Sequence, residues 1–334
     1  MKTVRVGVVG LGWFGEKHLQ ILSQLPNVEV VAVCSRTKSR AEEIAKRYGV
    51  KTAYTEWDRL AGDSRIDAVT VATHLPDHRK PVIACVEAGK DVFVEKPIAP
   101  TLKDADAMIA AARRAKVSFM VGHILRFENR YAQAKVAVDV GRVGKVVSIY
   151  ARRNIPASFA APHLSYAPAL VLDAVHDTDL MLWYTGKTVE NVYATFSKVG
   201  EVKNPDVCWG VYNFEGGAKG VCETVWVLRD NTPFSIDARM EILGTEGAIY
   251  IDSTENGLLI NDRDGTKRPD TVHWPVLHGW TTGALRDEVE YWIRCVANGV
   301  KPEVCTPADA RNALEVVLAA EDSSKKGRVV ELRP

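Results

Sequence analysis

The first 122 residues alternate between short apolar runs and amphipathic stretches. The apolar runs are rich in valine and predict buried strands at residues 4–9, 28–34, 66–72, 91–94 and 118–121. The amphipathic stretches predict helices at residues 16–25, 39–49, 79–88 and 102–115. This alternation of strand and helix predicts an α/β domain with a parallel sheet covered on both faces, the doubly wound Rossmann arrangement.

The pattern changes after Gly122. Helices are predicted at residues 128–139, 168–184, 285–297 and 307–323, and a strand at residues 145–152. Between residues 189 and 260, short strand-like runs are separated by glycine-containing turns. This succession predicts an α+β domain with a large, open and mostly antiparallel sheet. We therefore expect two domains, at residues 1–122 and 123–334.

Composition and charge narrow the function classes. Of 334 residues, 46% are hydrophobic and 25% are charged, as is usual for a globular protein. The formal net charge is +1, so no basic field is available to attract nucleic acid. No apolar run approaches the ~18 residues of a membrane span, and the first residues are unlike a signal peptide. The six cysteines have no metal-ligand spacing, so we expect no metal and reduced thiols in a cytoplasmic protein.

A glycine-rich motif follows the first predicted strand and opens the first helix. Its residues are Gly10, Leu11, Gly12, Trp13, Phe14 and Gly15, in the pattern GxGxxG. The first glycine makes a tight turn, the second lets the backbone approach a pyrophosphate, and the third lets the helix pack on the strand. The alternative is a glycine-rich turn that binds nothing. The strand–helix context favours a dinucleotide, which makes residues 1–122 the NAD(P)-binding domain.

The end of the second predicted strand bears on the choice of cofactor. An aspartate or glutamate at this place binds the adenine ribose hydroxyls and repels a 2′-phosphate. Here Ser35, Arg36 and Lys38 stand instead, a hydroxyl and two cations. They favour NADP, because arginine forks onto phosphate and serine donates to it, with NAD as the alternative. Alternatively, Arg36 and Lys38 are merely solvated residues at the start of a helix.

The predicted strand at residues 91–94 ends in a charged pair followed by proline, Glu95-Lys96-Pro97. Ligands of an open α/β sheet bind at the carboxyl ends of its strands, so Lys96 is placed to reach a nicotinamide. A surface ion pair of little energetic value explains the two charges equally well. The spacing alone does not choose between them.

Three stretches together resemble one enzyme family. VGVVGLGWFG, AGKDVFVEKPIA and VGHILRF are similar to the glucose-fructose oxidoreductase, inositol dehydrogenase and rhizopine-catabolism (Gfo/Idh/MocA) family, and the closing helices resemble it too. The resemblance implies that Lys96 hydrogen-bonds the reacting substrate oxygen and that Glu95 lies at the nicotinamide. It also implies cofactor contacts from the loop with Thr73, His74 and His78. The family often has proline and asparagine after that threonine, and this chain has His74 and Leu75.

A second catalytic element is predicted on the helix at residues 168–184. Asp173 and His176 are three residues apart and therefore share a helix face. A histidine oriented by a carboxylate is suited to take a hydroxyl proton. The resemblance implies this role for His176, in a run with Asp177 and Asp179. The family usually has an aspartate four residues before the histidine, where this chain has Leu172, so Asp173 is an uncertain match.

The remaining candidates are polar or aromatic residues expected to line a substrate pocket. The last Rossmann strand and the turn after it supply His123 and Arg126, and the first strand of the second domain ends in Arg153 and Asn154. A loop at residues 155–167 carries His163, and Trp280 is placed to stack on a sugar face. Each of them is equally suited to ordinary packing. Lys96, Asp173 and His176 complete the expected substrate contacts.

These features predict an NAD(P)-dependent oxidoreductase that moves hydride between the nicotinamide and a secondary alcohol or ketone. The substrate is a sugar, a sugar derivative or an inositol-like cyclic polyol, and Lys96 and His176 handle the hydroxyl proton. The alternatives are a glycosidase that uses NAD for transient oxidation, a dihydrodiol-dehydrogenase-like or biliverdin-reductase-like enzyme, and a non-catalytic dinucleotide sensor. Lys96 disfavours the sensor. An open sheet face must be covered, which predicts a homodimer or homotetramer.

Overall fold

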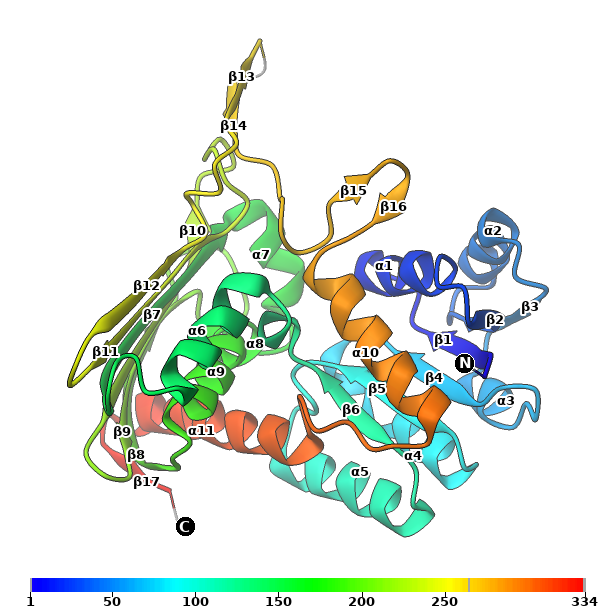
Figure 1. The fold of residues 1–334 in the computed structure, drawn as a ribbon, viewed down its shortest axis with the longest axis horizontal. Coiled ribbons are helices and arrows are strands. Elements are labelled where there is room, and N and C mark those ends of the chain that lie inside the picture. Colours follow the sequence, from blue (N-terminus) through cyan, green and yellow to red (C-terminus); the bar gives the residue numbers. More distant parts are fainter. Residues whose placement is uncertain (1, 264, 333–334) are drawn as a thin grey trace. The chain divides into compact units, whose positions relative to one another are not determined.

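The computed structural model describes residues 2–263 and 265–332. The chain forms two compact units, and neither is continuous in sequence (Figure 1). The first contains residues 1–127 and 272–311, and the second contains residues 128–271 and 312–334. The predicted boundary after Gly122 differs from this division because residues 272–311 pack with the N-terminal residues. A backbone bond from Val121 N–H to the Cys305 carbonyl is one of the contacts that join them.

The first unit is built on a six-stranded parallel sheet in the order β3-β2-β1-β4-β5-β6. This is the Rossmann order, so the predicted fold class is confirmed. The strands are β1 (Val4–Val9), β2 (Val28–Cys34), β3 (Thr52–Tyr54), β4 (Ala68–Val71), β5 (Asp91–Glu95) and β6 (Phe119–Gly122). The inner strand β4 and the edge strand β6 are both buried at every position. Helices lie on both faces of the sheet (Figure 1), and the backbone near Cys305 lies beside β6.

Helices connect these strands. They are α1 (Trp13–Leu22), α2 (Lys38–Tyr48), α3 (Trp57–Ala61), α4 (Arg79–Glu87) and α5 (Leu102–Ala115), and α10 (Ala284–Asn298) joins them from the distant segment. Local signals explain where two of them start or stop. Thr101 caps α5 by accepting a hydrogen bond from the Asp104 N–H, and Gly49 ends α2 in the left-handed conformation.

The second unit has a seven-stranded sheet in the order β12-β11-β7-β10-β9-β8-β17. Only β7 and β10 pair in parallel, so the predicted mostly antiparallel sheet is confirmed. Its strands are β7 (Val146–Pro156), β8 (Val189–Ser197), β9 (Val207–Phe214), β10 (Lys219–Leu228), β11 (Asp237–Gly244), β12 (Ala248–Asp252) and β17 (Val330–Glu331). Beyond β12, a two-stranded hairpin of β13 (Ile260–Asp262) and β14 (Gly265–Lys267) projects away from the sheet (Figure 1).

Helices cover one face of this sheet and leave the other uncovered (Figure 1). They are α6 (Asn129–Asp139), α7 (Ala157–His163), α8 (Ala169–Leu172), α9 (Val175–Thr185) and α11 (Pro307–Lys326), whose first turn belongs to the first unit. Two predictions for this unit are wrong in detail. The helix predicted at residues 168–184 is broken at Asp173 and Ala174 into α8 and α9, and the loop predicted at residues 155–167 contains the end of β7 and all of α7.

Candidate active site

In the glycine-rich turn between β1 and α1, the fold requires glycine at two positions, Gly10 and Gly15, but not at Gly12. Gly10 has φ +93°, and a Cβ there would lie 2.5 Å from the Ala72 carbonyl oxygen. A Cβ on Gly15 would overlap the carbonyl of Gly10. Gly12 has open space within 4 Å of where its Cβ would be, and as N-cap of α1 it makes no side-chain cap. The uncapped N–H groups of this helix end therefore fit the pyrophosphate of a dinucleotide.

Residues outside this turn hold its other members in place. Leu11 is buried, and its carbonyl accepts a hydrogen bond of 3.1 Å from Nε of Arg40 on α2. The same guanidinium donates from Nη2 to Glu16 of α1 at 2.6 Å. Trp13 is exposed, and its ring and that of Phe14 pack edge-on against Trp274, at 5.3 and 5.7 Å between centroids. Arg40 therefore holds the turn and the start of α1 together.

At the end of β2, the predicted cations already have acidic neighbours. Nη1 of Arg36 lies 3.3 Å from Oδ2 of Asp77, which belongs to the 3₁₀ turn Leu75–Asp77 after β4. Lys38 lies 3.8 Å from Glu42 of α2, and Ser35 accepts a hydrogen bond from the Thr37 N–H. The side chains of Arg36 and Lys38 are more than three-quarters exposed, so both are accessible to a ligand.

The loop after β4 carries the predicted Thr73, His74 and His78. His74 is exposed. Thr73 Oγ1 is buried and, among the residues that the structure describes, has no hydrogen-bond partner. His78 is buried, with its ring nitrogens facing backbone carbonyls: Nε2 lies 3.0 Å from Thr73 O, and Nδ1 lies 3.1 and 3.3 Å from Pro97 O and Ile98 O. This placement gives His78 a role in supporting the loop rather than one at its surface.

Strand β5 ends at Glu95, whose carboxylate points into the protein. Its Oε1 accepts a 2.9 Å hydrogen bond from Nε2 of His18 on α1, and its Oε2 accepts one of 3.2 Å from the Lys96 N–H. Gly122 leaves room for this carboxylate, since a Cβ there would lie 2.8 Å from Oε1. A surface ion pair therefore does not describe Glu95. Lys96 follows at the carboxyl end of the sheet, half-buried, before a cis bond to Pro97.

In the second unit, the break between α8 and α9 places Asp173 and His176. Asp173 has φ −129° and lies outside both helices, while its carbonyl accepts a hydrogen bond of 3.0 Å from the His176 N–H. His176 lies in the first turn of α9 and is 6% exposed, and Asp173 is half-buried. Asp177 and Asp179 follow it in the interior. The two candidates are therefore close in the backbone, although they do not share a regular helix face as predicted.

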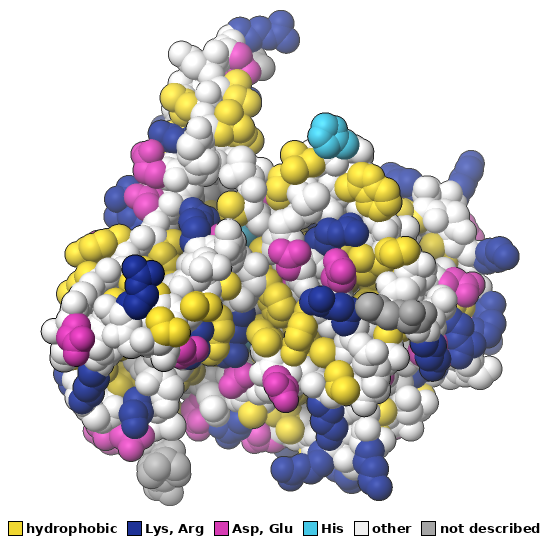
Figure 2. Space-filling view, in the orientation of Figure 1, with side chains coloured by type: hydrophobic (Ala, Val, Ile, Leu, Met, Phe, Trp, Pro, Cys, Tyr) yellow, Lys and Arg dark blue, Asp and Glu magenta, His cyan; other side chains and the backbone are white. Residues whose placement is uncertain are grey.

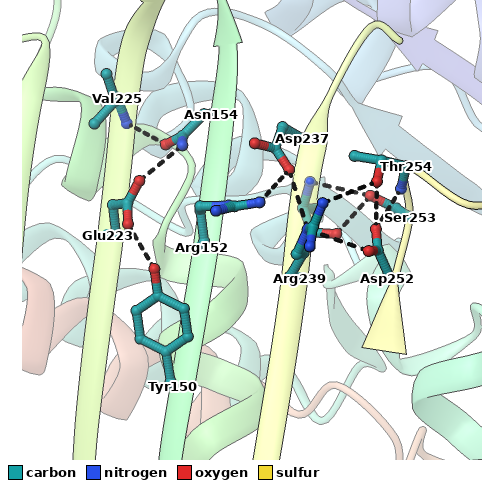
Figure 3. Close-up of polar contacts among 11 residues, drawn as sticks. Tyr150, Arg152, Asn154, Glu223, Val225, Asp237, Arg239, Asp252, Ser253 and Thr254 are labelled. Carbon is teal, nitrogen blue, oxygen red and sulfur yellow. Dashed lines mark hydrogen bonds and ion pairs between the residues drawn. The ribbon is translucent and has the colours of Figure 1, made fainter. Parts of the chain in front are cut away.

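Arg153 and Asn154 were predicted to line one pocket, but they lie on opposite faces of the sheet because successive side chains of a strand alternate. Arg153 faces α9, where it is buried and forms a two-bond ion pair with Asp177 at 2.7 and 2.9 Å. Asn154 lies on the other face, accepts a hydrogen bond from the Val225 N–H and donates to Glu223 (Figure 3). Contact of either residue with a substrate stays a prediction.

His123 and Arg126 lie in the turn after β6, in the first unit, and both are buried. Nη1 of Arg126 contacts Oδ2 of Asp309 at 3.2 Å, in the first turn of α11. The backbone carbonyl of His123 accepts a contact of 3.5 Å from the Cys305 thiol. These contacts join the turn to the distant segment at residues 272–311.

The last two candidates are at exposed positions. His163 ends α7, where Nδ1 lies 2.9 Å from Phe159 O and the ring stacks on Phe159. Trp280 lies on β16 (Trp280–Thr281), which forms a short hairpin with β15 (Val276–Leu277) in the first unit. The residue is 52% exposed, and the Arg286 guanidinium lies 5.8 Å from the centroid of its ring. Hydrophobic side chains gather over this hairpin (Figure 2).

Comparisons with known proteins agree with the fold of both units. Residues 4–123 match the family model of the oxidoreductase family with an NAD-binding Rossmann fold, and residues 131–250 match the GFO/IDH/MocA C-terminal domain. The chain belongs to the Gfo/Idh/MocA oxidoreductase family. Its first unit accordingly carries an NAD-binding Rossmann fold, and the predicted resemblance is confirmed.

Relatives of the Gfo/Idh/MocA enzyme match it over nearly its whole length. It is 29% identical to myo-inositol 2-dehydrogenase of Thermotoga maritima, with 98% of each chain covered. It is 28% identical to scyllo-inositol 2-dehydrogenase (NAD(+)) of Bacillus subtilis, covering 98% of this chain and 96% of that one. A solved structure of a probable dehydrogenase from Thermotoga maritima has a TM-score of 0.83 at 28% identity, with 98% of each chain covered.

Two further observations concern the part of the chain that the structure describes. Over residues 2–263 and 265–332, no group of three or more His, Cys, Asp and Glu side chains is arranged to hold a metal ion. Among the helices in the part of the chain that the structure describes, none is both long and apolar enough to span a membrane.

Three residues of this site were missed by the sequence analysis: His18, Arg40 and Asp77. His18 had a signal, because it is a polar residue among the core positions Leu19, Ile21 and Leu22 of α1. Arg40 and Asp77 had none, since arginine and aspartate at a helix start or turn are usually solvated. Their contacts join elements that are distant in sequence.

Proposed function

We propose that this enzyme is an NAD(P)-dependent dehydrogenase of a secondary alcohol in a sugar, a sugar derivative or a cyclic polyol. The observation that carries the proposal is the position of Lys96, at the carboxyl end of β5 in a sheet whose β1 ends in a dinucleotide-binding turn. The names of the relatives support the substrate class, since they include inositol dehydrogenases and a D-apiose dehydrogenase of Paraburkholderia graminis.

In the proposed reaction, His176 takes the proton of the substrate hydroxyl and Lys96 hydrogen-bonds the same oxygen as negative charge develops on it. Asp173 is proposed to orient His176, which is supported by the hydrogen bond between their backbones. When bound, the nicotinamide cofactor accepts the hydride in the oxidative direction and donates it in the reductive direction. The proposal requires Lys96 of the first unit and His176 of the second to reach one carbon of the substrate.

For the cofactor, we propose that the enzyme accepts NADP as well as NAD, with NADP preferred. Residues 10–15 hold the pyrophosphate, and Thr73, His74, Glu95 and Lys96 lie along the loops at the nicotinamide end. The support for NADP is that β2 is followed by Ser35, Arg36 and Lys38 without a carboxylate among them. The ion pair of Arg36 with Asp77 opposes this preference by offsetting one positive charge.

The test is the absorbance of reduced nicotinamide, followed with NAD and NADP separately across sugars, inositols and glycosides. The proposal expects steady formation of reduced cofactor with at least one polyol or sugar, and a loss of about 10²-fold or more in kcat for Lys96→Met. Cleavage of a glycoside without net reduction of the cofactor would replace the proposal with the glycosidase. Tight dinucleotide binding without turnover on any compound would favour the sensor.

We also propose that two copies associate through the uncovered face of the second unit's sheet. Across paired strands this face presents exposed side chains of Tyr193, Trp209, Val211 and Tyr250. Beside them lies a network of acidic and basic side chains, in which Arg152 pairs with Asp237 and Arg239 pairs with Asp252 (Figure 3). An apolar face with mixed charges suits a self-complementary contact about a two-fold axis.

Light scattering on a sizing column tests this association. Two copies or four are expected for the native chain, and a charge in the centre of the face, in Trp209→Glu, is expected to lower the mass to that of one chain. The matched control is Trp13→Glu, an exposed tryptophan of the first unit, which should leave the mass unchanged. A native monomer would refute the association.

A cytoplasmic location is supported by the cysteines. Each of the six is buried in the folded chain, as expected for thiols that stay reduced. Labelling of thiols in cell extracts prepared under acid quench tests this, and a disulfide trapped in the native protein would contradict it.

A further inference from the structure

The turn that carries Lys96 is contacted from two sides by buried histidines. His18 reaches its first residue, Glu95, from α1. His78 reaches its last two residues, Pro97 and Ile98, from the loop after β4. Both imidazoles are at most 1% exposed, so neither serves the surface.

Among the described residues, the His18 side chain makes one polar contact, and aromatic rings lie next to it. Its ring lies 5.3 Å from that of Phe14 and 5.2 Å from that of Phe93, between centroids. Nε2 is directed at Oε1 of Glu95 at 2.9 Å, and Oε2 of the same carboxylate accepts the Lys96 N–H. A leucine would fill this apolar space equally well, so packing alone does not explain the imidazole. The hydrogen bond to a buried carboxylate does, because an unpaired one is costly.

His78 joins two separate chain segments. Nε2 lies 3.0 Å from the carbonyl of Thr73, and Nδ1 lies 3.1 Å from that of Pro97 and 3.3 Å from that of Ile98. Carbonyl oxygens only accept hydrogen bonds, so the imidazole must donate. A neutral ring has one N–H and donates to one segment at a time, whereas a protonated ring donates to both. Burial lowers the pKa of His78, while these carbonyls and the charge of Glu95 act in the opposite direction.

We propose that His18 and His78 are positioning residues that fix the backbone on both sides of Lys96 and so aim its ammonium at the substrate oxygen. The inference rests on the catalytic role proposed for Lys96. It gives each buried imidazole a function, whereas packing alone does not explain why histidine stands there. It also links α1 and the Thr73 loop, which flank the cofactor, to the residue that contacts the substrate.

Replacing His78 by an amide side chain tests its two groups of contacts one at a time. Asparagine places its N–H₂ near Nδ1 of histidine, and glutamine places it near Nε2. His78→Asn therefore keeps a donor toward Pro97 and Ile98, His78→Gln keeps a donor toward Thr73, and His78→Leu removes the donor altogether. For His18, the contact to Glu95 comes from Nε2, so His18→Gln keeps it and His18→Leu removes it.

We expect kcat to fall at least about tenfold in His78→Leu, His78→Gln and His18→Leu, because a displaced catalytic group is costly even at 1 Å. His78→Asn and His18→Gln should recover most of kcat. KM for the substrate should change less than kcat in each variant, and thermal midpoints are recorded to separate folding from catalysis. Asparagine and glutamine at position 78 with equal kcat would overturn the inference for His78, as would His18→Leu with native kcat for His18.

A Lys96→Met background tests whether the histidines act through the lysine. There, His78→Leu and His18→Leu should lower kcat by less than about twofold, since no ammonium remains to be aimed. A full additional loss would show that they act elsewhere and would refute the inference. Native kcat in Lys96→Met alone would instead refute the proposed function, so the two failures are distinguishable.

Discussion

Asp177 belongs to the run around His176 that the family resemblance connects with catalysis, yet its contacts predict a role in stability. Its carboxylate is 1% exposed and receives both hydrogen bonds of the Arg153 guanidinium, itself 3% exposed. Burial alone would lower the pKa of Arg153, but the charge and hydrogen bonds of Asp177 raise it well above its ordinary value. The pair is therefore ionised inside the second unit.

Asp177→Asn tests this assignment. The change leaves a buried guanidinium without its counter-charge, and breaking a buried pair in this way costs about 3–5 kcal/mol. A domain of this size loses about 2–4 °C in thermal midpoint for each kcal/mol, so a fall of roughly 6–20 °C is expected. Replacing both partners by apolar residues, as in Arg153→Met with Asp177→Leu, should recover most of the loss because no charge is then left buried.

Thermal unfolding followed by circular dichroism measures the midpoints, and urea unfolding measures the free energies of unfolding. The kcat of each variant is recorded well below its thermal midpoint. The matched control is Lys326→Ala, which removes an exposed pair with Asp322 and should cost less than about 0.5 kcal/mol. A loss below about 1 kcal/mol for Asp177→Asn would refute the structural role. A large fall in kcat at unchanged stability would place Asp177 in catalysis instead.

Three further predictions follow from the first unit. Gly12→Ala should fold and bind NADH more weakly, whereas Gly15→Ala should lose its fold because its Cβ overlaps the Gly10 carbonyl; a folded Gly15→Ala by circular dichroism would contradict this. Asp77→Asn should raise the affinity for NADPH relative to NADH about fivefold, since an exposed pair contributes about 1 kcal/mol, and an unchanged ratio in fluorescence titrations would remove the case for Asp77. Burial raises the pKa values of Cys34, Cys85 and Cys208 to about 12. At pH 8 these thiols should therefore react with an aromatic disulfide roughly 10³-fold more slowly than in the unfolded chain. Rapid reaction of the native protein would contradict the raised pKa values.

The Rossmann unit was predictable because its signals are local. Each valine-rich run became a parallel strand, and GxGxxG marked the turn between β1 and α1. The short β3 lacked such a run and was missed. The packing of residues 272–311 with the N-terminal residues was also missed, because contacts such as Val121 to Cys305 join parts of the chain that no local pattern connects.

The sequence indicated which residues belong to the candidate site, but it did not indicate most of the contacts that these residues make. The apolar periodicity of residues 168–184 runs unbroken through Asp173, although the backbone leaves the helix there. Arg153 and Asn154 fell on opposite faces because β7 extends to Pro156, four residues beyond the predicted end, and keeps its alternation. His78 was predicted from its loop position, but its three carbonyl contacts come from backbone geometry that a sequence does not display.

Lys96 and His176 are proposed to act on one carbon of a bound polyol or sugar. Single-turnover formation of reduced nicotinamide tests it most directly, in the native enzyme, Lys96→Met, His176→Gln and the double variant. We expect the rate to fall about 10²- to 10⁴-fold in each single variant. The loss in the double variant should be well short of the product of the two, because the two groups serve the same step. A native rate in either single variant would contradict it.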